Sequence, residues 1–353
     1  MNSEQARVRP RFPRLRGDVW QDIPRLDLSK VQKTEWLIDS FLARGSTQLV
    51  WGSYGTNKTT AMLLAGWAVS RGREFLGKKT RQCWTLYLDY ENPVDAVKRI
   101  CEDLSIDPSG PAFTIWDRSA KSIPVPGDDS GTECLRQFVH HCKKITGRCP
   151  WIIFDSWTSL LKAGESGDKI GDATPIFRAV QKLRDEGCTI TIIDHTGKHG
   201  KDPIGTSAKM TQMDTFHSFK KDDKQSRLNL NQDGMKTVIR VESHLKRYAP
   251  KDVGTFSFEL LGRVNQKGEW HIQSLTPTKD KSESELEQKI NHLKKLILKN
   301  PMAGQEEIAK KASEKGSEPP ISRDNARSLL QDGIGKYWEA TSRGHGKLTF
   351  RVL

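Results

Sequence analysis

The chain has 353 residues, with 57 Lys and Arg against 44 Asp and Glu, which gives a net charge of +13. At about 150 residues per domain this length predicts two or more domains. The positive surplus favours a polyanionic partner, nucleic acid before membrane, because no apolar run approaches the ~20 residues of a spanning helix. The six cysteines stand apart without C-x-x-C or paired Cys/His spacing, so we expect a reduced, cytoplasmic chain with no zinc ribbon.

The first segment, residues 1–30, holds six arginines among prolines and few large aliphatic side chains. Such a segment buries too little apolar surface to offset its loss of conformational entropy, so we expect a basic, flexible arm. A solvated tail and a strap onto DNA or a neighbouring subunit are both compatible with this composition.

Residues 31–275 alternate between apolar runs and helical stretches, which predicts an α/β domain. The near-continuous apolar runs are typical of strands buried on both faces, as in a mostly parallel sheet flanked by helices. They lie at 48–52, 85–91, 151–157 and 189–195, with helical stretches at 59–71, 93–104 and 176–186. Alternating runs split by turns then predict antiparallel edge strands. These lie at 227–234, 236–248, 254–261 and 269–275.

The C-terminal part predicts a polar linker, 276–283, followed by a small module, 284–353. Ser284 and Glu287 have the spacing of a capping box, which indicates a helix start. We expect a second helix at 305–313 and a third after the N-cap Ser322. A hairpin follows, with Trp338 in the core at its base. Three helices and a hairpin with a basic, glycine-rich tip are the order of a winged helix-turn-helix.

The segment GSYGTNKTT leaves an apolar strand and enters an apolar helix. In that position backbone N–H groups and the helix dipole face a phosphate chain, Lys58 reaches the β- and γ-phosphates, and Thr59 ligates Mg²⁺. Asn57 replaces the second glycine of G-x-x-x-x-G-K-[ST], and Asn accepts a positive φ better than most residues. The alternative is a loop that only links strand to helix. The predicted phosphate-binding residues are Gly52, Ser53, Tyr54, Gly55, Thr56, Asn57, Lys58, Thr59 and Thr60.

Polar side chains end the other apolar runs, at the sheet edge where ligands of open α/β sheets bind. Asp155 ends WIIFD and is predicted to be the second Mg²⁺-side residue. Glu91 ends LYLDYE and can accept a proton from the attacking water, with Asp89 as the deeper competitor. His195 ends TITIIDH and is interpreted as a γ-phosphate sensor, although a polar core histidine is the alternative. Together these residues predict a MgATP site.

The motif order GSYGTNKTT, LYLDYEN, WIIFD, IIDHTGK resembles the RecA-like ATPases of the DnaB and plasmid RepA helicase type, over about residues 33–262. The resemblance implies a homo-oligomeric, hexameric ring that hydrolyses ATP between subunits and moves along single-stranded DNA. It implies Glu91 as the catalytic carboxylate and His195 as the sensor. Lys246 and Arg247 correspond to basic fingers that reach the neighbour's γ-phosphate; the family spaces them one apart, whereas here they are adjacent. A solvated edge-strand pair is the alternative.

Basic residues of two regions are the candidate DNA contacts. The loop 197–214 is rich in Gly, Lys and Ser and corresponds in the family to the lining of the ring channel; a charged surface loop is equally consistent with this composition. The third helix and hairpin tip of the C-terminal module offer groove and backbone donors. The candidates are Lys198, Lys201, Lys209, Arg323, Arg327, Arg343 and Lys347. The sequence thus favours an ATP-dependent DNA helicase or translocase of a mobile element. A DNA-binding replication regulator or loader with a nucleotide switch and no unwinding activity is the alternative.

Overall fold

The computed structural model describes residues 34–119, 122–161, 165, 169–196, 212–223, 226–229, 234–246, 255–278, 281–314, 321–342 and 348–353. Contacts divide the chain into Met1–Glu35 and Trp36–Leu353, and every named element belongs to the second unit. Within the described ranges, none of the helices combines the length and apolarity needed to cross a membrane.

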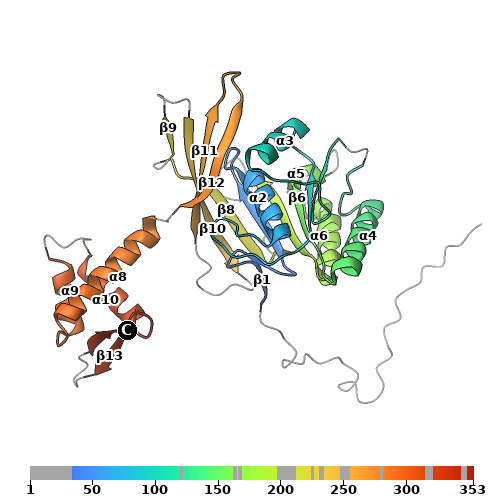
Figure 1. The fold of residues 1–353 in the computed structure, drawn as a ribbon. Coiled ribbons are helices and arrows are strands. Elements are labelled where there is room, and N and C mark those ends of the chain that lie inside the picture. Colours follow the sequence, from blue (N-terminus) through green and yellow to red (C-terminus); the bar gives the residue numbers. More distant parts are fainter. Residues whose placement is uncertain are drawn as a thin grey trace, which may run out of the picture. The chain divides into compact units, whose positions relative to one another are not determined.

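In the described part of the chain, ten strands form one sheet (Figure 1). The order is β12-β11-β10-β8-β3-β7-β6-β4-β5, with β9 paired to β10. The six neighbouring strands β8, β3, β7, β6, β4 and β5 run parallel to one another. Strands β10, β11 and β12 extend the sheet with antiparallel pairs. The strands are β3 (Thr47–Gly52), β4 (Thr85–Asp89), β5 (Phe113–Asp117), β6 (Trp151–Asp155), β7 (Thr189–His195), β8 (Thr215–Lys221), β9 (Arg227–Asn229), β10 (Gly234–Lys246), β11 (Phe256–Val264) and β12 (Trp270–Thr278). The predicted α/β class and antiparallel additions are confirmed.

Helices cover both faces of the parallel strands, because strand residues alternate between two apolar cores. Val50 and Ile153 belong to the core that contains α2 and α3, whereas Trp51 and Phe154 belong to the core that contains α4, α5 and α6. The small strands β1 (Trp36–Ile38) and β2 (Leu42–Ala43) pack into the first core. The helices are α2 (Lys58–Arg71), α3 (Val94–Asp103), α4 (Asp129–Thr146), α5 (Trp157–Leu160) and α6 (Ile170–Asp185).

Two strand ends differ from the sequence prediction. The run 85–91 stops at Asp89, because the carboxylate Oδ1 of Asp89 accepts hydrogen bonds from the backbone N–H of Glu91 (3.1 Å) and of Asn92 (2.9 Å) and turns the chain. Glu91 therefore lies in a turn and not on the strand. The run 151–157 stops at Asp155, and the short helix α5 follows.

The predicted linker is also shorter than expected. Strand β12 continues through Thr278, which pairs with Ser257 of β11, and α8 begins at Lys281. A polar sequence is compatible with the end of an edge strand and with the first turn of a helix, because both tolerate exposed polar side chains. Ser284 consequently lies inside α8, and the prediction of a capping box there is wrong.

The C-terminal elements have an apolar core of their own. They are the helices α8 (Lys281–Lys299), α9 (Gln305–Ala312) and α10 (Arg323–Asp332) and the antiparallel hairpin β13 (Trp338–Ser342) and β14 (Leu348–Val352). Ser322 caps α10 by accepting from the backbone N–H of Asn325. Trp338 is fully buried and donates from its indole N–H to the Leu330 carbonyl (2.7 Å), as a core position requires.

Candidate active site

The loop between β3 and α2 has the backbone of a phosphate loop. Gly52 is needed because a Cβ there would lie 2.4 Å from the carbonyl oxygen of Phe219. Gly55 (φ 75°) and Asn57 (φ 55°, ψ 33°) both adopt the left-handed conformation. Asn57 therefore supplies the turn for which the G-K-[ST] pattern uses glycine, and the prediction that Asn permits this turn is confirmed.

Lys58 folds back onto this loop. Its ammonium donates to the carbonyl oxygens of Gly52 (2.7 Å) and Ser53 (3.1 Å), and its side chain is almost completely buried. Burial lowers the pKa of Lys58 to about 8, against the attraction of nearby carboxylates, of which Asp155 is the strongest. A buried cation whose hydrogen-bond acceptors are neutral carbonyls gains more from a phosphate oxygen than from its present acceptors.

Thr59 and Asp155 form a pair suited to a divalent cation. The Thr59 hydroxyl donates to Asp155 Oδ2 (2.7 Å), and Tyr87 donates its phenol hydrogen to the same oxygen (2.6 Å). Burial raises the pKa of Asp155 to about 6, and the hydrogen bonds from Tyr87 and Thr59 act against that rise. A hydroxyl and a buried carboxylate are hard oxygen ligands of the kind Mg²⁺ takes, so these residues fit the predicted metal.

Glu91 is held ionised from two sides. Its Oε2 accepts a hydrogen bond from Ser156 and lies 3.3 Å from His195 Nε2. The hydrogen bond from His195 is the main cause that lowers the pKa of Glu91, and it outweighs partial burial. An ionised carboxylate beside the phosphate loop can act as a general base.

His195 connects the two halves of the site. Strand β7 lies between β3 and β6, so His195 ends beside both the phosphate loop and the Asp155 strand. The Nδ1 atom of His195 is 3.4 Å from the Lys58 ammonium, while its Nε2 meets Glu91. Tyr54 stacks on the imidazole, with ring centroids 4.2 Å apart at 18°. The predicted residues Lys58, Glu91 and His195 are thus direct neighbours.

The sequence prediction missed several side chains of this site. Tyr87 and Ser156 each donate to one of the two acidic residues, and Asn92 donates to Asp89 and, at 3.4 Å, to Asp155. Asp89, the competing candidate, is fully buried, and its carboxylate shapes the turn that carries Glu91. Finding these contacts from sequence requires knowing that β4 and β6 are neighbours.

A family model described as an AAA domain matches residues 12–201, more than half of the chain and all of the site residues above. The chain belongs to this AAA domain family. The family is of the P-loop ATPase kind, which agrees with the phosphate loop and supports nucleotide binding and ATP hydrolysis. No curated protein matches the chain. The AAA domain match ends before β8, the antiparallel strands β9 to β12 and the C-terminal elements.

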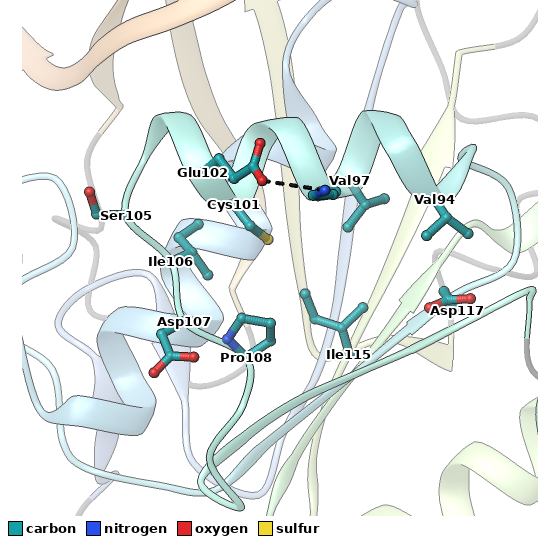
Figure 2. A pocket seen from close by; sticks show the side chains of 11 residues that line it. Val94, Val97, Cys101, Glu102, Ser105, Ile106, Asp107, Pro108, Ile115 and Asp117 are labelled. Carbon is teal, nitrogen blue, oxygen red and sulfur yellow. Dashed lines mark ion pairs between the residues drawn. The ribbon is translucent and has the colours of Figure 1, made fainter.

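Two pockets lie on the α/β part of the chain. A cavity of 340 Å³ borders the phosphate loop of the AAA domain, between Ser53, Tyr54 and the end of β8 at Lys220 and Lys221. A larger pocket of 550 Å³ lies between α3 and β5, where Figure 2 shows Cys101, Ile106 and Ile115 turned toward one another. The smaller cavity is lined by the phosphate-loop residues Gly52, Ser53, Tyr54 and Thr56, whereas none of the phosphate-loop or acidic site residues lines the larger pocket.

The remaining predicted residues are only partly described. Lys198, Lys201, Lys209, Arg247, Arg343 and Lys347 lie outside the described residues. Arg323 and Arg327 of α10 both contact Glu306 of α9, at 2.8 and 2.7 Å, and Arg327 also pairs with Asp324 (2.7 Å). Both arginines are thus paired with acidic residues among the C-terminal elements, whereas the sequence prediction assigned them to DNA.

Proposed function

We propose that this chain is an ATP-driven motor on DNA, a helicase or translocase of a plasmid, phage or other mobile element that acts as a homo-oligomeric, hexameric ring on single-stranded DNA. The observation that carries the proposal is that the phosphate loop, the Thr59–Asp155 pair and the Glu91–His195 pair meet at one edge of the sheet. Membership of the AAA domain family supports the ATPase part of it.

Each site residue has a separate role in the proposed hydrolysis of ATP. Lys58 leaves the loop carbonyls for the β- and γ-phosphate oxygens, where its charge is better compensated. Thr59 and Asp155 would hold Mg²⁺, which when bound would neutralise charge on the phosphates. Glu91 takes a proton from the attacking water, and His195 senses the γ-phosphate because it already lies beside both Lys58 and Glu91. The cavity beside the loop is of a size that suits the nucleoside end of ATP.

The position of Lys246 supports hydrolysis between subunits. Strand β10 runs antiparallel to β8, and Lys246 pairs with Thr215 at the start of β8, whereas Phe219, near the end of β8, pairs with Gly52 of the phosphate loop. Thr215 and Phe219 are four residues apart on β8, so the pairing position of Lys246 lies about 13 Å along the strands from that of Gly52. The backbone of residue 246 therefore lies away from the phosphate loop of its own subunit, which agrees with a basic finger that serves a neighbouring subunit.

The DNA contacts rest on charge and on the C-terminal elements. The surplus of +13 favours a polyanion. Three helices with a hairpin and a separate core support the assignment of residues 284–353 as a winged-helix module that binds duplex DNA. The single-stranded DNA contacts of the ring are assigned to Lys198, Lys201 and Lys209.

The test combines hydrolysis, assembly and unwinding. We expect MgATP hydrolysis that single-stranded DNA stimulates, a hexameric mass in solution with a non-hydrolysable ATP analogue, and strand displacement on a forked substrate. Lys58→Ala should abolish hydrolysis, whereas Lys144→Ala, an exposed lysine of α4, should leave it unchanged. Wild-type protein that hydrolyses no ATP with or without DNA contradicts the proposal. DNA-stimulated hydrolysis without strand displacement narrows it to a translocase or loader.

A further inference from the structure

Tyr87 is a buried side chain of the candidate site to which the proposed hydrolysis gives no role. It lies on β4 with no exposed surface, and its phenol donates to Asp155 Oδ2 at 2.6 Å. The register of β4 and β6 pairs Tyr87 with Ile153 and Asp89 with Asp155, so Tyr87 sits one step below Asp155 on the same face of the sheet. This is the face that α2 covers.

The hydrogen bond from Tyr87 has a fixed direction. The phenol O–H of Tyr87 is the donor in this contact, because a carboxylate oxygen accepts. A buried phenol that donates at 2.6 Å to a buried carboxylate makes a strong, charge-assisted hydrogen bond whenever Asp155 is ionised.

The other donors to Asp155 are weaker or temporary. Thr59 donates to Oδ2 at 2.7 Å. When the Thr59 hydroxyl turns its lone pairs toward a cation, its hydrogen turns away and this hydrogen bond weakens. Asn92 reaches the same oxygen at 3.4 Å, and its amide is shared with Asp89 Oδ1 at 3.0 Å. All three hydrogen bonds end on Oδ2. Together they fix the rotation of the carboxylate.

We propose that Tyr87 is a positioning residue for the metal of the ATP site: its phenol holds the Asp155 carboxylate in the rotation that receives Mg²⁺ beside Thr59. This inference rests on the proposed ATPase function. It adds a buried residue of β4 to a site otherwise built from the phosphate loop, the turn after β4 and the ends of β6 and β7. Removing an outer hydrogen bond of this kind lowers metal affinity by about 10- to 100-fold in other sites.

The test compares two Tyr→Phe variants, each of which loses one hydrogen bond donated by a tyrosine hydroxyl. Tyr87→Phe removes the hydroxyl that contacts Asp155, and Tyr90→Phe removes a hydroxyl that donates to the Pro124 carbonyl at 2.7 Å. We expect Tyr87→Phe to raise the Mg²⁺ concentration for half-maximal ATPase by about tenfold or more, with the rate at saturating Mg²⁺ largely recovered. Tyr90→Phe should keep the wild-type Mg²⁺ dependence.

A second measurement separates the metal from the nucleotide and from folding. Binding of a fluorescent ATP analogue in excess chelator should be equal for wild type, Tyr87→Phe and Tyr90→Phe. Should Tyr87→Phe fail to fold, Asn92→Ala must raise the Mg²⁺ requirement in the same direction by a smaller factor. A wild-type Mg²⁺ dependence in folded Tyr87→Phe, or in Asn92→Ala where only that variant folds, overturns the inference and leaves the ATPase proposal standing. Absence of hydrolysis in the wild type overturns the ATPase proposal itself.

Discussion

Replacing Lys58 with methionine is expected to abolish ATP hydrolysis and, at the same time, to stabilise the nucleotide-free protein. Lys58 is 5% exposed, and burial lowers the pKa of its amine from 10.5 to about 8. At ~1.4 kcal/mol for each pH unit, folding disfavours the charged amine by about 3 kcal/mol. Methionine removes that cost but also the hydrogen bonds to Gly52 and Ser53, at about 1 kcal/mol each. The net gain at pH 7 is about 1 kcal/mol.

The sign of the pH dependence follows from the same pKa. Below pH 8 the amine is protonated in the folded and the unfolded chain, so the full cost of burying its charge is present. Between pH 8 and 10.5 the unfolded chain binds the proton and the folded chain does not, so the stability of the wild type rises with pH. The advantage of Lys58→Met should therefore shrink through this window.

Chemical denaturation followed by tryptophan fluorescence, without nucleotide, at several pH values from 7 to about 9.5 measures this difference. Lys58→Arg is the control, because arginine keeps its charge at every one of these pH values and so keeps the cost of burying a charge. The reasoning is refuted if Lys58→Met is less stable than the wild type at pH 7, or if its advantage grows as the pH rises.

Three further changes test other parts of the chain. Glu91→Gln should lower the hydrolysis rate by about 10²- to 10⁴-fold while ATP binding is retained, and unchanged turnover would exclude Glu91 as the base. Asn57→Gly should keep full ATPase activity, whereas Asn57→Val should cost about 1–2 kcal/mol in an unfolding titration, because a branched side chain opposes the left-handed backbone. Glu306→Gln removes the acidic partner that Arg323 and Arg327 share, leaves Arg327 paired with Asp324, and should tighten duplex DNA binding at low salt. Glu307→Gln, which loses only a pair with Lys311 on the same helix, should not; equal affinities would argue against DNA contacts from α10.

The phosphate loop and the sheet class were predictable because their signals are local. A glycine-rich segment between a buried strand and an apolar helix fixes its own geometry, and even Asn57 follows from the tolerance of Asn for a positive φ. The four predicted parallel strands are apolar on both faces, which only a covered sheet explains. The C-terminal helices and hairpin were predictable from periodicity and from the Ser322 cap.

Elements with a mixed face were missed. Strand β8 contains a histidine, a serine and two terminal lysines, yet it pairs with β3 in parallel and forms one wall of the cavity beside the loop. Helix α4 buries only Leu135, Val139, Cys142 and Gly131 and is polar elsewhere. Edge strand β5 is half-buried except at Phe113. In each case the apolar pattern is too sparse to distinguish from a solvated loop, and tertiary pairing decides the structure.

The order of strands in the sheet explains why the site itself was only half predictable. Sequence indicates which residues end strands, but it does not say that β7 lies between β3 and β6 or that β4 lies on the far side of β6. That order alone places His195 within reach of both Lys58 and Glu91 and places Tyr87 beneath Asp155. A phosphate that draws Lys58 off the loop carbonyls also changes the charge that His195 faces, and His195 is the main hydrogen-bond donor to Glu91. The proposed base is therefore coupled to the phosphate through a single imidazole, and this coupling follows from the sheet order rather than from any one motif.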